Sequence, residues 1–164
     1  MKKTFKYLVI GTFSLGAAVS SSSVFAADGT GNASATIQTA ISIVENTSMD
    51  FGTTAVDASS GTVTISSAGV VSGPAAYSFS GSPAAGAFTA SGDASTAVTI
   101  SFTDGSLTGP GTAMTLNNFT HDAGGTPTTN GSGDLTFNVG GDLVVNATQT
   151  AGAYSGTYTV TVNY

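Results

Sequence analysis

Hydrophobic and polar residues alternate with a period of two along most of the chain from residue 33 onward. Successive side chains of a β-strand point to opposite faces, so this alternation predicts short strands rather than helices. The first such stretch is ASATIQTAISIV, residues 33–44. The other stretches with this pattern are residues 49–51, 62–65, 77–79, 87–89, 97–102, 114–116, 135–139, 143–145 and a closing strand within residues 151–164.

Turn-forming pairs separate these stretches: Gly-Asp, Asp-Gly, Gly-Pro, Asn-Gly and Gly-Gly. Turn signals that recur about every 8 to 12 residues are typical of a β-sandwich or barrel. The competing interpretation is a disordered polymer rich in Gly, Ser and Thr. We disfavour it because hydrophobic residues make up 40% of the chain and fall at strand spacing. The pattern therefore predicts one all-β domain, an antiparallel sandwich.

The beginning of the chain has the features of a secretion signal. Three lysines within the first six residues precede an apolar stretch, residues 8–19, and Ala26 ends a small-residue pattern that a signal peptidase accepts. The apolar stretch is shorter than the ~20 residues of a membrane-spanning helix. We expect residues 1–26 to be a signal peptide and residues 27–164 to be one exported domain. Its expected location is the bacterial cell surface or the medium, reached through the periplasm, without membrane insertion.

Loss of this leader removes every lysine, and the chain contains no arginine. The formal net charge then falls from −6 to −9 (−6 − 3). Binding to nucleic acid or anionic lipid through charge is therefore not expected. The simplest explanation of the acidity is solubility, with cation binding as the alternative. Because cysteine is also absent, the fold must rest on its core, its hydrogen-bond ladders or neighbours that complete it.

Candidates for catalysis or metal binding are few. The one histidine, His121, lies beside Asp122, but there is no G-x-S-x-G motif, no cysteine nucleophile and no lysine base in the mature chain. One histidine without cysteine does not make a typical zinc site. The loop TNGSGD, residues 129–134, offers a single carboxylate, Asp134, so a hairpin turn is favoured over a calcium site. No glycine-rich phosphate loop is present. We expect no enzyme activity, cofactor or metal.

The two terminal strands are the remaining candidates for function. Natural monomers usually guard exposed strand edges with lysine, proline or an inward-pointing charge, and the mature chain has no lysine. These strands either pair inside their own sandwich or add to the sheet of another chain. The candidate pairing residues, one face of each strand, are Ala33, Ala35, Ile37, Ile41 and Ile43 together with Tyr158, Val160, Val162 and Tyr164.

Four stretches resemble a bacterial secreted family known as domain of unknown function 4402. They are MDFGTTAV, AFTASGDASTAVTISF, MTLNNFT and, the most specific, VGGDLVVNATQTAGAYSGTYTVTVNY. The resemblance covers about residues 35–164. The closing motif, Gly-x-Tyr followed by a Thr/Val strand, is also similar to spore coat protein U-like domains, which are subunits of archaic chaperone-usher pili.

The pilin resemblance implies an incomplete immunoglobulin-like antiparallel β-sandwich. It also implies identical subunits, a periplasmic chaperone and an outer-membrane usher as partners. The residues from Tyr158 to Tyr164 would form the strand that the chaperone recognises, and those from Ala33 to Ile43 would be donor-like. The chain departs from these pilins because it lacks their cysteines, and only residues 27–34 precede the aligned first strand. Either the 33–43 strand is itself donated or the fold is complete.

The function expected on these grounds is a non-enzymatic structural subunit of a surface filament, such as a fimbria or pilus, or of a coat. The alternative is a self-contained secreted sandwich that acts as a monomer. Such a monomer would bind a glycan through exposed Tyr77 or Tyr154, or bind calcium through its aspartates.

Overall fold

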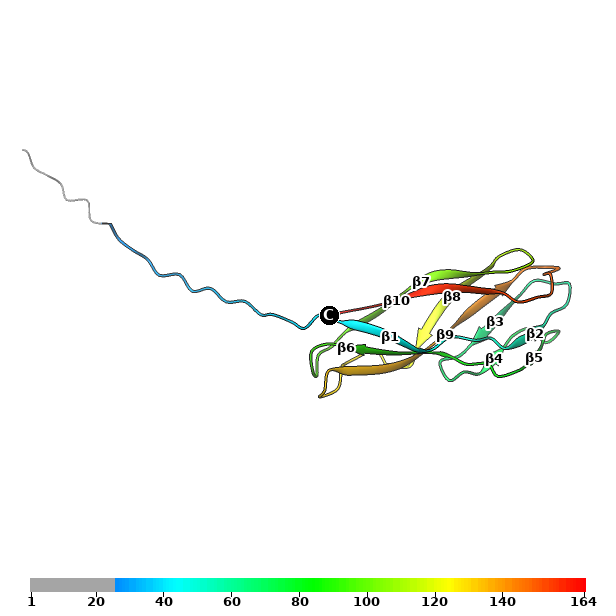
Figure 1. The fold of residues 1–164 in the computed structure, drawn as a ribbon, viewed down its shortest axis with the longest axis horizontal. Coiled ribbons are helices and arrows are strands. Elements are labelled where there is room, and N and C mark those ends of the chain that lie inside the picture. Colours follow the sequence, from blue (N-terminus) through cyan, green and yellow to red (C-terminus); the bar gives the residue numbers. More distant parts are fainter. Residues whose placement is uncertain (1–25) are drawn as a thin grey trace, which may run out of the picture. The chain divides into compact units, whose positions relative to one another are not determined.

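Antiparallel ladders organise the chain. The computed structural model describes residues 26–164, and this part of the chain contains ten strands and no helix (Figure 1). Thr36–Tyr164 forms one compact unit. The strands are β1 (Ser42–Thr47), β2 (Thr53–Ala55), β3 (Gly61–Ile65), β4 (Val71–Ser72), β5 (Ser78–Ser80), β6 (Gly86–Ser91), β7 (Thr99–Thr108), β8 (Met114–His121), β9 (Asp134–Val145) and β10 (Ser155–Asn163).

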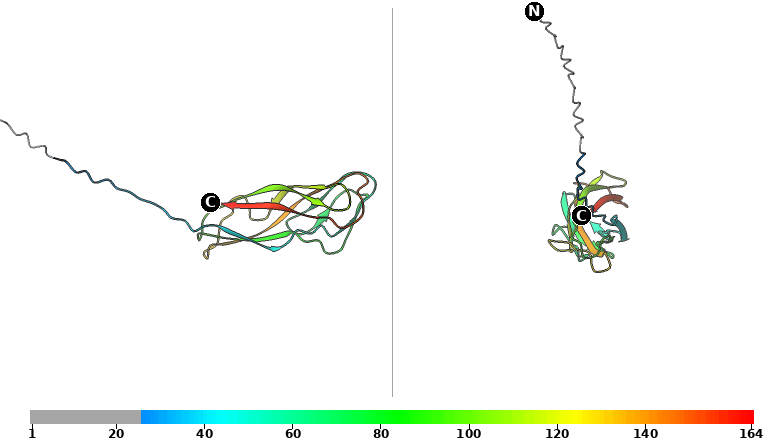
Figure 2. Two further views of the ribbon diagram at one scale, coloured as in Figure 1. Left: turned by 45° about the horizontal axis from the view of Figure 1, so that its top comes forward. Right: turned by 90° about the vertical axis from the view of Figure 1, so that its left-hand side faces the viewer.

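The main sheet has the order β1-β6-β9-β8-β7-β10, and β3 joins it by pairing with β9 and β4. β2 and β5 form a separate two-stranded ladder. The main sheet curves around a common interior, which brings its first and last strands to neighbouring positions (Figures 1 and 2). The result is a nearly closed, barrel-like sandwich, so the predicted all-β antiparallel sandwich is confirmed.

β9 is the central strand of this arrangement. Its first half pairs with β6, its second half pairs with β3, and β8 lies along its other edge. The sequence pattern indicated two strands separated by a turn at Gly140 and Gly141, and this expectation is wrong. A Cβ atom at Gly140 would overlap the backbone carbonyl oxygen of Ile65. Glycine therefore allows the close backbone approach at which β9 changes partner, and the chain continues without a turn.

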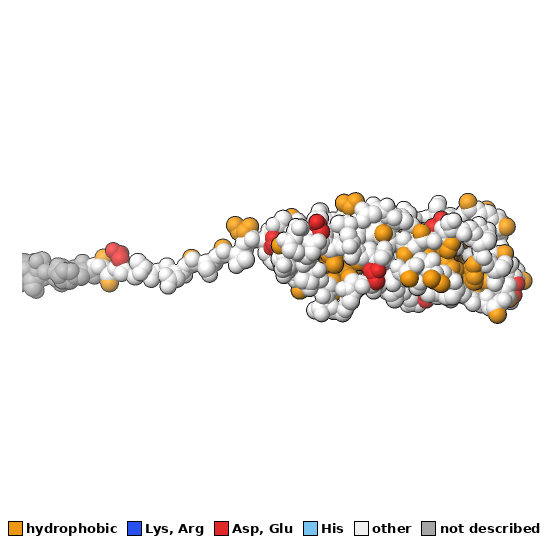
Figure 3. Space-filling model, turned by 90° about the horizontal axis from the view of Figure 1, so that it is seen from below, with side chains coloured by type: hydrophobic (Ala, Val, Ile, Leu, Met, Phe, Trp, Pro, Cys, Tyr) orange, Lys and Arg blue, Asp and Glu red, His pale blue; other side chains and the backbone are white. Residues whose placement is uncertain are grey.

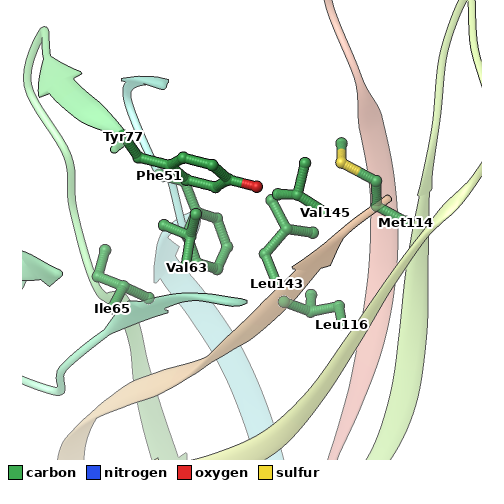
Figure 4. Packing of buried hydrophobic residues seen from close by; sticks show 8 residues of the cluster. All are labelled: Phe51, Val63, Ile65, Tyr77, Met114, Leu116, Leu143 and Val145. Carbon is green, nitrogen blue, oxygen red and sulfur yellow. The ribbon is translucent and has the colours of Figure 1, made fainter. Parts of the chain in front are cut away.

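Buried side chains form two clusters. The first consists of Phe51, Val63, Ile65, Tyr77, Met114, Leu116, Leu143 and Val145, which point toward one another from β3, β8, β9 and the neighbouring loops (Figure 4). The second consists of Phe88, Ala90, Val98, Phe137, Val139 and Val162. Burying one such large aliphatic or aromatic side chain stabilises a fold by about 1.5–3 kcal/mol. These clusters supply the core that a chain without disulfides requires.

The first strand is shorter than the alternation predicted. β1 begins at Ser42, and residues 26–40 are exposed and carry no secondary structure. β6 ends at Ser91, which is the partner of Ser42, so no strand remains to pair with the preceding residues. An alternating pattern becomes a strand only where a ladder partner exists. The expected strand over residues 33–41 is therefore absent.

The predicted signal peptide covers residues 1–26. Only Ala26 of this segment belongs to the described residues. Across residues 26–164, the structure has no helix that meets the length and hydrophobicity needed to span a membrane.

Candidate functional site

β1 and β10 lie at the two ends of the main sheet and face each other across an open seam. In the described residues β1 pairs only with β6, β10 pairs only with β7, and no ladder joins β1 to β10. A groove of about 340 Å³ opens between them. We call it the seam groove, and it is lined by Ile43, Glu45, Ser48, Met49, Phe88, Gly156, Thr157, Tyr158 and Val160. Each of the two strands thus has one hydrogen-bonding edge without a strand partner.

The β10 side of the seam groove follows the predicted alternation. Tyr158 and Val160 are half-buried and Val162 is buried, whereas the threonines between them are exposed. Val162 belongs to the second core cluster, and Tyr158 and Val160 pack against it. The inner face of β10 therefore covers the core, while its free edge borders the groove.

The β1 side is covered more thinly. All six residues of β1 are exposed, including Val44 at 60% and Ile43 at 36% of their surface. The register with β6 shifts between Glu45 and Thr47. Glu45 is the one charged residue of β1, so this edge has little of the protection that isolated edge strands usually carry.

Tyr158 forms part of the floor of the seam groove. Its ring stacks on Phe119 at a centroid distance of 4.8 Å and meets Phe88 edge-on at 6.2 Å. Its hydroxyl is buried and has no hydrogen-bond partner. Burial, with the nearby Glu45 carboxylate adding to it, raises the pKa of Tyr158 to about 12. A neutral, buried donor beside the groove therefore has no hydrogen-bond partner among the described residues.

A hydrogen-bonded cycle closes one end of the seam. The Tyr164 hydroxyl donates to the carbonyl oxygen of Thr39 at 2.8 Å and accepts from the amide of Asp93 at 2.6 Å. The Thr39 amide donates to Oδ1 of Asp93 at 2.9 Å, and hydrogen bonds from Thr39 lower the pKa of the Asp93 carboxyl. We call these three residues the Tyr164 latch. It ties the segment before β1 to the last residue after β10.

The latch escaped the sequence analysis because its partners are far apart along the chain. Tyr164 lies 125 positions from Thr39 and 71 positions from Asp93. The terminal tyrosine was a candidate for strand pairing, but no local pattern marked Thr39 or Asp93 as its partners.

The candidate pairing residues before β10 separate into two groups. Ile43 lines the seam groove, and Ile41 is half-buried against the second core cluster. Ala33, Ala35 and Ile37 are exposed and take no part in any ladder. Ile37 is 93% exposed, an extreme value for a large aliphatic side chain. The structure thus brings Ile43 together with Tyr158 and Val160, but does not bring the three earlier residues to them.

His121 and Asp122 are engaged separately. The His121 ring, at the end of β8, lies 6.1 Å from the Phe102 ring and 6.3 Å from the Phe137 ring, and its Nδ1 atom is buried without a partner. Both carboxylate oxygens of Asp122 accept hydrogen bonds from Asn138, each at 2.7 Å. Burial alone would raise the pKa of Asp122, but the bonds from Asn138 outweigh it and the pKa is lowered. The pair is not arranged as a base and its orienting carboxylate.

The loop over residues 129–134 is held by its own hydrogen bonds. Oδ1 of Asn130 accepts from the amides of Ser132 at 2.8 Å and Asp134 at 3.0 Å, and Asp134 accepts from the Ser91 hydroxyl at 2.6 Å. An asparagine that bonds to backbone amides further along the chain is typical of a turn. Within residues 26–164, no three His, Cys, Asp or Glu side chains are grouped to hold a metal ion.

The two tyrosines considered for glycan binding both donate their hydroxyls to backbone carbonyls. Tyr77 was expected to be exposed but is buried, with 7% of its surface accessible, and donates to the carbonyl of Ser59 at 2.9 Å. Tyr154 is half-buried and donates to the carbonyl of Thr150 at 2.7 Å. The expectation of an exposed Tyr77 is therefore wrong, because its ring fills the first core cluster.

Comparison with curated proteins and with solved structures found no match to the chain. The family model described as "Domain of unknown function (DUF4402)" matches residues 41–164. The matched region begins one residue before β1 and includes both strands of the seam. Because the match covers most of the chain, the protein belongs to the DUF4402 family.

Proposed function

We propose that this protein is a non-enzymatic structural subunit of a bacterial surface filament or coat, and that neighbouring copies pair through β-strands. The observation that supports this proposal is the open seam, where two strand edges without partners border one groove. An extended segment placed there finds backbone donors and acceptors on both sides, and its alternate side chains enter the groove. Its backbone hydrogen bonds to β1 and β10 would close the sheet, which is open at the seam.

The segment before β1 of a second copy is the partner that fits best. Residues 29–41 carry no charged side chain, which matters because every other charged group of the mature chain is acidic and would repel Glu45. Ala33, Ala35 and Ile37 fall on one face of an extended chain. Residues 29–38 span about 33 Å when extended, more than the ~20 Å of a six-residue strand such as β1. The segment is therefore long and neutral enough to fill the seam of a neighbour.

Export through the predicted leader would place the subunits in the periplasm and then on the cell surface. Before assembly, an open seam exposes a partly apolar groove and two free edges, and free edges are prone to aggregation. A periplasmic chaperone that covers β10, and an outer-membrane usher that receives the subunit, would meet this need. Both partners rest on the resemblance of the closing motif to pilin domains.

The test is to shear producing cells and run the released protein on a denaturing gel with and without boiling. We expect an unboiled ladder at multiples of the subunit mass, which collapses to monomer on boiling because the subunits complete one another's sheets. A monomer band in both lanes would contradict the proposal and favour the self-contained monomer.

Two variants test whether the gel ladder depends on strand pairing at the seam. Ile37→Asp changes a side chain that is 93% exposed, so the fold remains intact while the partner strand loses its largest apolar side chain. We expect the ladder to disappear. Val160→Lys places a charge in the seam groove and should prevent accumulation, whereas Thr161→Lys, on the exposed face of the same strand, should have little effect. Normal ladders from both Ile37→Asp and Val160→Lys would count against the seam.

A further inference from the structure

The Tyr164 latch lies on the chain just before β1. Thr39, the latch residue of the leading segment, comes three positions before Ser42, where β1 begins (42 − 39). Tyr164 lies beside the start of β1 (Figure 1). In the proposed filament, residues 29–38 of each copy are held in the seam groove of a neighbour. A pull between two copies therefore enters a subunit at residue 38 and reaches the latch before it reaches β1.

β1 by itself is weakly attached to the rest of the domain. All six of its residues are exposed, and none belongs to either core cluster. Within the described residues, β1 forms one ladder, with β6, and the register of this ladder shifts between Glu45 and Thr47. One side-chain bond, from Asn46 to Thr89 at 2.7 Å, adds to it. Tension applied directly to β1 would therefore be resisted by few contacts.

The latch connects the chain ahead of β1 to parts that are held more firmly. Tyr164 follows β10, which pairs with β7 along its length and buries Val162 in the second core cluster. The carbonyl oxygen of Asp93 accepts a hydrogen bond from the hydroxyl of Thr129 at 2.5 Å, and Thr129 is buried, with 4% of its surface accessible. A pull on Thr39 is therefore passed to β10 and to the Asp93 loop as well as to β1.

The contacts around the latch are close and specific. The Tyr164 hydroxyl uses its proton on Thr39 and accepts from the amide of Asp93. A Cβ atom at Gly92 would overlap this hydroxyl and would lie 3.0 Å from the side chain of Ile41. Ile41, between the latch and β1, is half-buried against the second core cluster. Glycine at position 92 thus leaves the space in which the latch closes.

We infer that the Tyr164 latch is a mechanical clamp, which carries the pull that a neighbouring copy exerts through the leading segment and so keeps β1 on β6 under tension. The inference rests on the proposed function and adds the path of the load through each subunit. Thr39 is held by two bonds, one on its carbonyl and one on its amide. Both bonds share the load before it reaches β1.

Pulling on single molecules of the full chain tests the inference. The chain has no cysteine, so Ile37→Cys and Thr136→Cys provide two unique points of attachment. Ile37 is 93% exposed and lies ahead of the latch, and Thr136 is exposed on the central strand β9. At constant force, the rate of the first lengthening step, the release of residues 39–47, measures how firmly the clamp holds.

Two variants of the doubly labelled chain each remove one of the bonds on Thr39. Tyr164→Phe removes the bond to its carbonyl, and Asp93→Ala removes the acceptor of its amide. We expect the first step to be about three- to tenfold faster in each variant, since the loss of one hydrogen bond lowers the barrier to release. The step should be faster still in the double variant.

Tyr154→Phe is the matched control for these variants. It also removes a hydrogen bond from a tyrosine hydroxyl to a backbone carbonyl, that of Thr150 at 2.7 Å. Tyr154 directly precedes β10, so it lies at the opposite end of this strand from Tyr164. We expect Tyr154→Phe to lower the urea midpoint and to leave the rate of the first step unchanged.

The outcomes separate this inference from the proposed function. A first step as slow in Tyr164→Phe and Asp93→Ala as in the wild type overturns the clamp and leaves strand pairing in place. An equal acceleration in Tyr154→Phe also overturns it, because the effect would then reflect overall stability. Absence of a wild-type ladder on the gel overturns the proposed function, and with it the pull that the clamp is inferred to carry.

Discussion

At the scale of single residues, Tyr158 shows most clearly which properties the sequence pattern predicts and which it does not. The alternation of the closing strand correctly indicated that Tyr158 shares a face with Val160 and Val162. It did not indicate that the hydroxyl is buried without a partner, because that depends on Gly86 and Phe88 of β6, which are 72 and 70 positions away (158 − 86 and 158 − 88). Burial depends on which strand lies opposite, and local sequence does not specify that.

The raised pKa of Tyr158 makes stability depend on alkaline pH. In the unfolded chain a tyrosine loses its proton near its ordinary pKa of 10.0, but in the folded protein the pKa of Tyr158 is about 12. The unfolded state therefore binds fewer protons in this range, and the free energy of unfolding falls as pH rises from about 10 toward 12.

Urea unfolding of the wild type and of Tyr158→Phe at pH 9 and pH 11 measures this effect. We expect a smaller loss in the variant, with a remainder from Tyr77, whose pKa burial and the Asp57 carboxylate also raise. Equal losses in the two proteins would show that Tyr158 is not desolvated.

At the scale of the strands, the sequence pattern predicted most elements and misjudged those whose limits depend on a partner. The stretches at residues 62–65 and 87–89 lie within β3 and β6. β8 continues past the predicted residues 114–116 to His121, because β9 extends alongside it as far as Val139. β1 begins later than its alternation suggests, because β6 ends. Partner length, which is set by tertiary contacts, thus decides where each strand stops.

The Tyr164 latch connects two of these elements at the closed end of the seam. Replacing Tyr164 with phenylalanine removes the bonds to both Thr39 and Asp93 while keeping the ring. We expect the free energy of unfolding to fall by about 1–2 kcal/mol, since two hydrogen bonds are lost at a partly exposed site. Urea denaturation of the monomeric protein measures this change.

Tyr154→Phe is the control, because it removes one hydrogen bond, to the Thr150 carbonyl, instead of two. A loss for Tyr164→Phe no greater than that for Tyr154→Phe would mean that the latch contributes nothing beyond a single hydrogen bond.

At the scale of the whole molecule, almost every pair of charged side chains in residues 27–164 repels. Residues 27–164 contain nine aspartates and glutamates and no lysine or arginine. On the face shown in Figure 3, the acidic side chains of the domain lie apart from one another among uncharged and hydrophobic ones. Several of them, such as Asp122 and Asp142, accept hydrogen bonds from neighbouring side chains. Their mutual repulsion is therefore long-range rather than concentrated at one point.

Salt should stabilise the fold by screening this repulsion. The Debye length falls from about 30 Å at 0.01 M to about 8 Å at 0.15 M salt. We expect the melting temperature to rise over this range for NaCl, and to rise equally for CaCl₂ at matched ionic strength. A larger effect of Ca²⁺, reversed by chelator at constant ionic strength, would instead reveal specific calcium binding.

The sequence by itself determined the local properties of this protein: the period-two strands, the turns between them, the acidic charge and the inner face of β10. These follow from the geometry of an extended chain and from residue type, which any short window contains. Only the tertiary structure decided that β9 is one strand with three partners, that residues 26–40 join no ladder, and that β1 and β10 border the same open groove. Each of these depends on which distant segments meet, because backbone hydrogen bonds and buried contacts are satisfied across the whole fold rather than within one segment.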